Sequence, residues 1–274
     1  SPDTNIETVV NQAWAASADH TELFERRQQR ALERWTRVQP NENPATAKNE
    51  EIFVVGNVPP ARIESVLLDL DKAIAQTKKL LRLKQTGPLL KGGITVFVLK
   101  NRYDYSEFGR MTENRELPKE WLGHWHADPV DAYCVLAADG EMDSEQTAAV
   151  ALQVISGAYL GSFADVPTWF AEGVARSLVR TSFRRDDPRV LTWQRALPNA
   201  LLKVDDSKAL LEGRLDQETA GLVGMNLAVL MMDRANRRRF DSLLELLRDG
   251  QTFTQACTAA YAPPEILVKG WLGK

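Results

Sequence analysis

Two histidines separated by one residue, His124 and His126, have the spacing that most directly suggests chemistry. On an extended segment, alternation would place both imidazoles on one side of the chain, and imidazole is a common metal ligand. Asp128 and Asp131 follow closely and would add carboxylate oxygens. The segment nevertheless precedes a predicted strand and is expected to form a loop, where histidines more often lie at the surface or form hydrogen bonds. Metal binding and a non-catalytic role are therefore two open interpretations.

Glu172 is the other acidic residue with a distinctive setting. It belongs to the run VPTWFAEG, residues 166–173, which begins a predicted helix with Pro167 in its first turn. A carboxylate near a helix N-terminus is stabilised by the helix dipole by about 0.3–1 kcal/mol. Arg176 is four residues further on and can pair with Glu172 on the same helix face. We also expect Gln153, on the preceding predicted helix, to hydrogen-bond to Glu172.

Other catalytic motifs are missing from the sequence. It has no glycine-rich phosphate loop, no Gly-x-Ser-x-Gly motif and no Cys-x-x-Cys pair, so nucleotide-binding, serine-hydrolase and redox functions have no support. Cys134 and Cys257 lie in apolar surroundings, which favours buried free thiols over a disulfide. Trp121 and Trp125 are expected to pack against the domain rather than stack on a ligand.

Composition excludes some classes of partner. The chain has 274 residues, 44% hydrophobic residues and a net charge of −3, so it has no overall attraction to nucleic acid or to acidic membranes. No run approaches the roughly 20 apolar residues that a membrane-spanning helix needs. The sequence begins at Ser1 without a methionine, from which we expect a processed or expressed form. The chain is separately expected to be part of a larger multidomain protein. It leaves the compartment open, with secretion or a periplasmic location as one alternative.

The pattern of elements predicts an α+β fold. Residues 1–45 are predicted to form an N-terminal helical arm and linker, because Thr21–Arg37 has helical spacing and two prolines follow at 40 and 44. Hydrophobic runs predict strands at 51–56, 94–99 and 132–137, with a long helix at 61–83 and a short one at 103–111. A turn at Asp139-Gly140 and a helix cap at Asp143 or Ser144 are expected next. Helices are then predicted at 144–160, from 166, and at 187–199, 207–213, 216–236, 238–248, 252–261 and 263–272.

The run VPTWFAEG resembles the third-ligand helix of gluzincin zinc peptidases, in the peptidase-MA-like superfamily. Two weaker similarities fall in the right order: the strand–helix–strand opening from Phe53 to Leu99, and the tail from Phe240 to Trp271. The resemblance covers most of residues 50–274. It implies a gluzincin-like domain at 46–274, with a small mixed or antiparallel sheet lobe at 46–140 and a mainly helical lobe at 141–274. It also implies that Glu172 stands where the family binds zinc.

The residues that the resemblance would require for catalysis are missing. The family has a His-Glu-x-x-His helix upstream of the glutamate, in which two histidines bind zinc and the glutamate acts as general base. One register places Gln153 and Gly157 at the histidine positions and Val154 at the base position. No other register restores the motif, because residues 127–274 contain no histidine. The tyrosine or histidine that relatives often use for the oxyanion is also absent between residues 161 and 260.

We therefore predict a catalytically inactive metallopeptidase-like domain, without a cofactor, that binds protein or peptide or serves as a structural module. In active relatives the third strand borders the substrate cleft, so its edge residues Tyr133, Val135 and Ala137 are candidates for pairing with a peptide. The alternative is a metal-dependent hydrolase whose ligands are His124, His126 and Glu172. A third interpretation is a structural domain of a larger protein, attached through the N-terminal arm.

A cluster of arginines at 234 and 237–239 is the remaining charged feature, and Asp233 and Asp241 border it. Such clusters usually form a solvated corner between helices, and we favour that interpretation. Binding of an acidic partner is the alternative.

Overall fold

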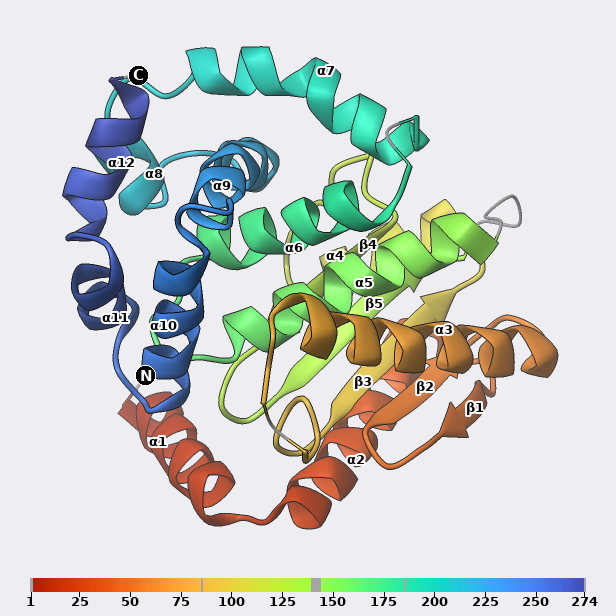
Figure 1. Ribbon diagram of the computed structural model, residues 1–274. Helices are drawn as coiled ribbons and strands as arrows, with labels where there is room; N and C mark the ends of the chain where they lie inside the picture. Colours follow the sequence, from red (N-terminus) through yellow and green to blue (C-terminus); the bar gives the residue numbers. More distant parts are fainter. Residues whose placement is uncertain (1, 85, 139–143, 185, 274) are drawn as a thin grey trace. The chain divides into compact units, whose positions relative to one another are not determined.

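The computed structural model describes residues 2–84, 86–138, 144–184 and 186–273 (Figure 1). Its internal contacts divide the chain into two compact units. Unit 1 comprises Ser1–Lys78 and Leu83–Ser162, and unit 2 comprises Lys79–Arg82 and Phe163–Lys274. This division differs from the predicted lobe boundary at residue 140, because the helix predicted at 144–160 belongs to the same unit as the strands.

Unit 1 contains a mixed sheet that has five strands within the described residues, in the order β1-β2-β3-β5-β4. The strands are β1 (Ala45–Lys48), β2 (Ile52–Gly56), β3 (Ile94–Leu99), β4 (Gly123–Ala127) and β5 (Ala132–Ala137). β2, β3 and β5 are parallel, whereas β1 and β4 run antiparallel to their neighbours at the two ends. Every residue of the three parallel strands is buried, as expected for strands covered on both faces.

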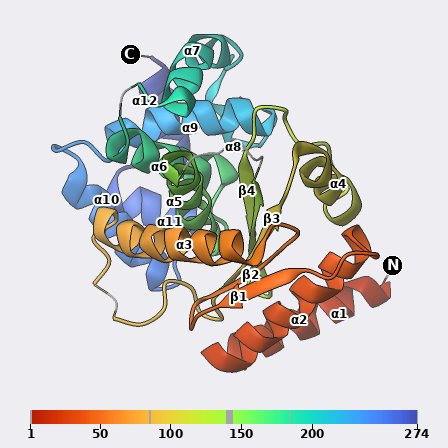
Figure 2. The same cartoon turned by 90° about the vertical axis from the view of Figure 1, so that its right-hand side faces the viewer.

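Helices cover both faces of this sheet. They are α2 (His20–Val38), α3 (Pro60–Leu80), α4 (Arg102–Thr112) and α5 (Ser144–Gly161), whereas α1 (Pro2–Ser17) packs next to the start of α2. Figure 2 shows α3 and α5 on one face and α2 and α4 on the other. On the α2–α4 side, alternate strand residues such as Phe97 and Val135 form one core cluster with Trp35 and Phe108. The predicted α+β class is thereby confirmed, with a mixed sheet flanked by helices.

The N-terminal segment is part of unit 1 and not a separate arm. α2 begins with a capping box between Asp19 and Glu22 and buries one side, including Phe24 and Trp35, in the sheet core. Arg27 is also buried there, and its guanidinium donates hydrogen bonds to the carbonyls of Gly93, Lys91 and Val130. Burial lowers the pKa of Arg27 to about 10. Residues 1–45 are helical over α1 and α2, as predicted, but α2 packs into the core of unit 1.

Unit 2 is helical apart from its connecting segments. It contains α6 (Thr168–Ser182), α7 (Pro188–Leu202), α8 (Ser207–Leu211), α9 (Gln217–Met231), α10 (Arg237–Arg248), α11 (Phe253–Ala260) and α12 (Pro264–Leu272). α6 and α9 approach closely because both have glycine at the crossing. A Cβ at Gly173 would collide with the backbone of Gly224, and one at Gly224 would collide with the carbonyl of Trp169. These two glycines therefore set the distance between the helices.

The strands predicted at 51–56, 94–99 and 132–137 are confirmed as β2, β3 and β5. Two strands were missed: β1, which follows the predicted linker, and β4, which was expected to be a loop. The turn expected at Asp139-Gly140 and the cap expected at Asp143 lie outside the described residues. Among the helices that the structure describes, none combines the length and the apolar character needed to cross a membrane.

Candidate functional site

The predicted upstream helix is α5 of unit 1, and it carries Gln153, Val154 and Gly157. Val154 is fully buried, and Gln153 is 9% exposed. Gly157 faces the indole of Trp125, which comes from β4: a Cβ at this position, or at Gly161 one turn later, would collide with that ring. Trp125 therefore packs against α5, as predicted. In the proposed register, the space for the second histidine is filled by tryptophan.

Glu172 lies on α6 of unit 2, within the buried part of that helix. Its carboxylate accepts a hydrogen bond of 2.7 Å from Nε of Arg176, which confirms the predicted pair at i,i+4. The remaining two nitrogens of Arg176 donate to both oxygens of Glu218 at 2.9 and 2.7 Å. The Arg176 side chain is 1% exposed, and its guanidinium carbon lies 5.1 Å from the ring centre of Trp193. We refer to Glu172, Arg176 and Glu218 as the buried ion triad.

The charges of the ion triad stabilise one another. Burial by itself lowers the pKa of Arg176, but the charges and hydrogen bonds of Glu172 and Glu218 outweigh it and raise that pKa above its ordinary value. The guanidinium is therefore permanently charged, and it offers hydrogen-bond donors only. It neutralises Glu172 but has no open coordination position that could bind and activate a water molecule, as a metal ion has.

Gly221 of α9 leaves space for the side chains of Glu172 and Arg176. A Cβ at Gly221 would lie 2.9 Å from Cγ of Glu172 and 3.1 Å from the guanidinium carbon of Arg176. Glu218 stands in the first turn of the same helix, after the N-cap Asp216, where a carboxylate is favourable. The start of α9 thus supplies a carboxylate to Arg176, and Gly221 leaves space for its guanidinium. Glu218 was missed from the sequence, since only the packing of α6 on α9 brings it to Arg176.

His124 is a buried member of a hydrogen-bonded network in unit 1. Its Nδ1 lies 2.8 Å from the hydroxyl of Tyr105, and its Nε2 lies 2.9 Å from Oε1 of Glu113. Tyr133 donates to the same carboxylate oxygen, and Arg115 pairs with the other. We call these five residues the His124 network. Both imidazole nitrogens are thus already in use.

The pKa values in the His124 network favour a neutral imidazole beside an ionised carboxylate. Burial lowers the pKa of His124. Burial alone raises the pKa of Glu113, but the hydrogen bonds from His124 and Arg115 together with the charge of Arg115 lower it below its ordinary value. With this charge state, Nε2–H of His124 donates to Glu113, and Nδ1 accepts from Tyr105. The network connects α4, the loop after it, β4 and β5.

His126 is more accessible, with 44% of its side chain exposed, and it pairs with Asp128 at 2.9 Å. Its ring stacks on Tyr133 at 5.0 Å. Asp131 pairs instead with Arg34 of α2. Glu172, the third ligand of the alternative hydrolase, belongs to unit 2 whereas both histidines belong to unit 1. In the part of the chain that the structure describes, no three His, Cys, Asp or Glu side chains form a group that could hold a metal ion.

The predicted peptide-binding edge is not an edge. β5 pairs with β3 on one side and with β4 on the other, so its backbone is already hydrogen-bonded along both sides. The side chains of Tyr133, Val135 and Ala137 are buried in the core cluster. The assignment of these residues to a free edge was therefore wrong, and the terminal strand on that side is β4. Cys134 on β5 and Cys257 on α11 are buried free thiols, as predicted.

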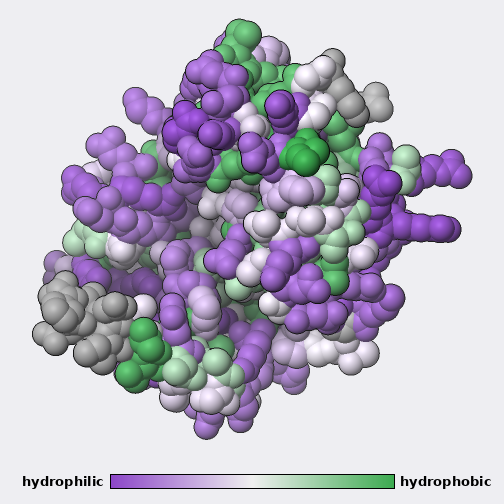
Figure 3. Space-filling model, turned by 90° about the vertical axis from the view of Figure 1, so that its left-hand side faces the viewer, coloured by the Kyte–Doolittle hydropathy of each residue, from purple (hydrophilic) through white to green (hydrophobic). Residues whose placement is uncertain are grey.

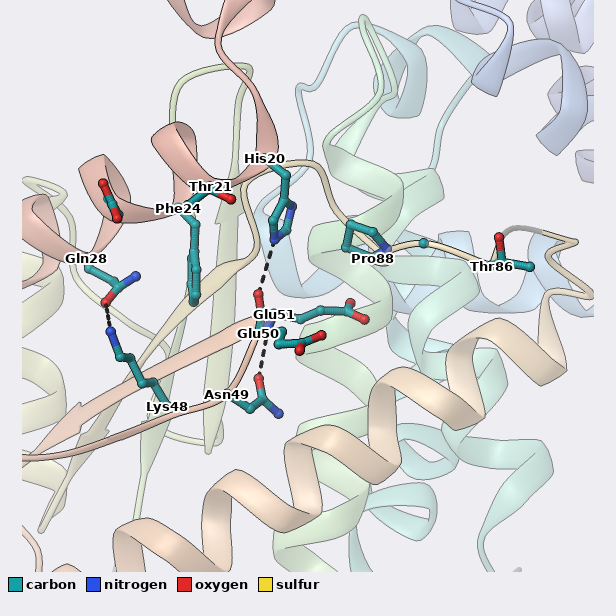
Figure 4. Close-up of a pocket in the computed structure, with 12 residues that line it drawn as sticks. His20, Thr21, Phe24, Gln28, Lys48, Asn49, Glu50, Glu51, Thr86 and Pro88 are labelled. Atoms are coloured by element: carbon teal, nitrogen blue, oxygen red, sulfur yellow. Dashed lines mark hydrogen bonds between the residues drawn. The ribbon is translucent and has the colours of Figure 1, made fainter.

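A cavity of about 580 Å³ lies in unit 1 between α2, the β1–β2 turn and the segment after α3 (Figure 4). Phe24 and His20 line it from α2. His20 is held on both sides, because its Nδ1 accepts from the amide of Gly92 and its Nε2 lies 3.1 Å from the carbonyl of Glu50. Glu51, also in the lining, pairs with Lys78. The polar groups of the walls thus mainly contact other protein groups, and no chemistry follows from this cavity.

Comparison with known proteins leaves the family open: no protein-family model matches the chain, and no curated protein matches it.

Proposed function

We propose that this chain is a non-hydrolytic protein with a peptidase-MA-like, gluzincin-type body that acts as a protein- or peptide-binding or structural module. The order of elements supports the proposal: a β2–α3–β3 opening and a covered sheet precede α5, and the VPTWFAEG run begins α6. This is the order that the resemblance implies for the strands, the upstream helix and the glutamate helix.

The observation that carries the proposal is the commitment of Glu172 to Arg176 within the buried ion triad. A catalytic zinc site needs three protein ligands and an open position for water. Here a protein cation already holds the one carboxylate that the resemblance assigns to zinc. A metal ion bound at Glu172 would place a second positive charge beside the Arg176 guanidinium, which is 1% exposed, or would displace that guanidinium from the carboxylate.

The alternative hydrolase with His124, His126 and Glu172 has less support. Metal binding by His124 would break its hydrogen bond to Tyr105 or to Glu113 inside the protein. The Asp128 partner of His126 would also have to be displaced or shared.

Metal analysis separates the two functions. The full chain is purified without chelators, incubated with zinc, desalted and analysed by mass spectrometry of its metal content. We expect no stoichiometric zinc in the wild type, and the same result for His126→Ala and Glu172→Gln. One zinc per chain that is lost in both variants would overturn the proposal and favour the hydrolase.

For the binding role we propose β4, because it has a strand neighbour on one side only within the described sheet. Terminal strands can accept an extended peptide through backbone hydrogen bonds. Titration with labelled unfolded peptides should give saturable binding, and backbone N-methylation of the same peptides should abolish it. Equal binding of the methylated peptides, or no binding of either set, would contradict strand addition.

A further inference from the structure

A groove of about 320 Å³ lies among α9, α10 and α12 of unit 2, with Tyr261 and Ala262 from the α11–α12 connection in its wall. The apolar part of its lining is formed by Leu227, Leu230, Met231, Ile266, Leu267 and Trp271. Two polar side chains of the lining hydrogen-bond to the C-terminal end of α9. The Tyr261 hydroxyl donates to the carbonyl of Met231, and the Asn236 side-chain amide donates to the carbonyl of Leu230.

The groove holds apolar side chains in contact with water. Ile266 is 62% exposed and Leu230 is 43% exposed, and both line it. Single exposed apolar residues are ordinary, but two in one concave site form a receptor for apolar groups. On the face shown in Figure 3, hydrophobic residues lie in small patches between hydrophilic ones.

The first turn of α10, beside the groove, carries a positive charge that is unusual at the start of a helix. The first turn of α10 contains Arg237, Arg238 and Arg239 and no acidic residue, and the cap residue Asn236 makes no side-chain capping bond. Positive charge at a helix N-terminus opposes the helix dipole. Arg237 is paired with Asp241, whereas Arg238 and Arg239 are exposed.

The two exposed arginines have no carboxylate partner within the described residues. Arg239 itself lines the groove. Asp233 accepts a hydrogen bond from the backbone amide of Asn236 at this helix start, but the two exposed cations still oppose the helix dipole. Local conflicts of this kind are found at functional surfaces.

We propose that this groove binds an acidic amphipathic helix of a partner protein. The apolar side chains of that helix would enter between Leu230 and Ile266, and its carboxylates would lie against Arg238, Arg239 and the N-terminus of α10. The volume is at the lower end of the roughly 300–1,000 Å³ of ligand pockets and suits a few side chains presented by a helix. An anionic membrane is disfavoured because the site is concave. The inference goes beyond the proposed function and does not depend on it, since metal binding is not involved.

The test uses the full chain and fluorescein-labelled synthetic helical peptides, with binding measured by fluorescence anisotropy. Every peptide has leucine on one helical face, and its polar face is glutamate, glutamine or lysine. We expect tightest binding for the glutamate series and none for the lysine series. The double variant Arg238→Glu/Arg239→Glu and the variant Ile266→Ser should each weaken binding of the glutamate series by at least about tenfold. Arg195→Glu and Leu202→Ser, exposed positions on α7, are the matched controls and should bind as the wild type does.

Three results would overturn the inference. The first is an absence of binding by every glutamate peptide, or equal binding by the lysine series. The second is vesicle binding to anionic lipid that is lost in the same variants, which would make the surface a membrane contact. The third is a concentration-dependent dimer that Ile266→Ser dissociates, which would make a second copy of the chain the occupant.

Discussion

Replacing Arg176 by methionine tests the buried ion triad directly. Methionine preserves the apolar stem but removes the guanidinium, so Glu172, whose side chain is 8% exposed, loses the cation that pairs with it. Glu218 is less affected, because 27% of its side chain is exposed and water can replace part of the interaction. Removing one partner of a buried pair costs about 3–5 kcal/mol, mostly because the other charge stays buried. We expect Arg176→Met to lose an amount in this range at pH 7.

Urea unfolding followed by circular dichroism measures this deficit, and hydrogen exchange of α6 and α9 locates it. Arg180→Met is the matched control: Arg180 is on the same helix and half-buried, and its loss should cost less than about 0.5 kcal/mol. The double variant Glu172→Gln/Arg176→Met should recover part of the loss, because the buried charge is then absent. The reasoning is refuted if Arg176→Met costs no more than Arg180→Met.

Three further outcomes follow from the contacts. Gly157→Ala should lower the free energy of unfolding in urea by about 1–3 kcal/mol, because the added Cβ collides with Trp125. The control Gly270→Ala has open space at its Cβ and should be neutral or stabilising. Equal effects of the two substitutions would contradict the packing of Trp125 on α5. In the His124 network the pKa of Glu113 is depressed, so its contribution to stability is present above pH 4.3 or so and is lost as the pH falls below that value. Glu113→Gln should therefore flatten the loss of thermal stability between pH 5 and pH 3, and an unchanged profile would contradict this. Arg239→Glu should raise the free energy of unfolding by about 0.3–1 kcal/mol at low salt by relieving the conflict at the start of α10, and destabilisation would argue against it.

Hydrophobic patterning predicted the three parallel strands correctly, because their conformation depends mainly on the local run of apolar residues. β2, β3 and β5 are continuous apolar runs, and such runs form buried parallel strands wherever helices can cover both faces. β4 was missed because its residues, Gly-His-Trp-His-Ala, include no β-branched side chain and only one large apolar residue. Its conformation is fixed by pairing with β5, a tertiary effect that no local pattern encodes.

The charged pattern of α2 misled the domain assignment. Glutamates alternate with arginines along this helix, which indicated a solvated face and a free arm. One of those arginines, Arg27, is instead buried and satisfied by three carbonyls from distant loops. Whether an arginine is exposed or serves as a buried hydrogen-bond donor depends on which carbonyls the rest of the fold brings to it. The sequence contains no signal for that.

The candidate site shows the same division between local and long-range information. The pair Glu172–Arg176 follows from helical spacing and was predicted, whereas Glu218, 42 residues from Arg176, required the packing of α6 on α9. The His124 network likewise joins residues from separate elements. For a reaction, a site must hold at least one group that is open to substrate or water. Glu172 and His124, the two residues with the strongest sequence case for chemistry, instead have their hydrogen-bonding capacity directed at neighbouring protein groups, and each would have to give up a buried partner before it could act. The free-energy cost of breaking these buried interactions, together with the missing histidine motif, is the physical argument for the proposed function without hydrolysis.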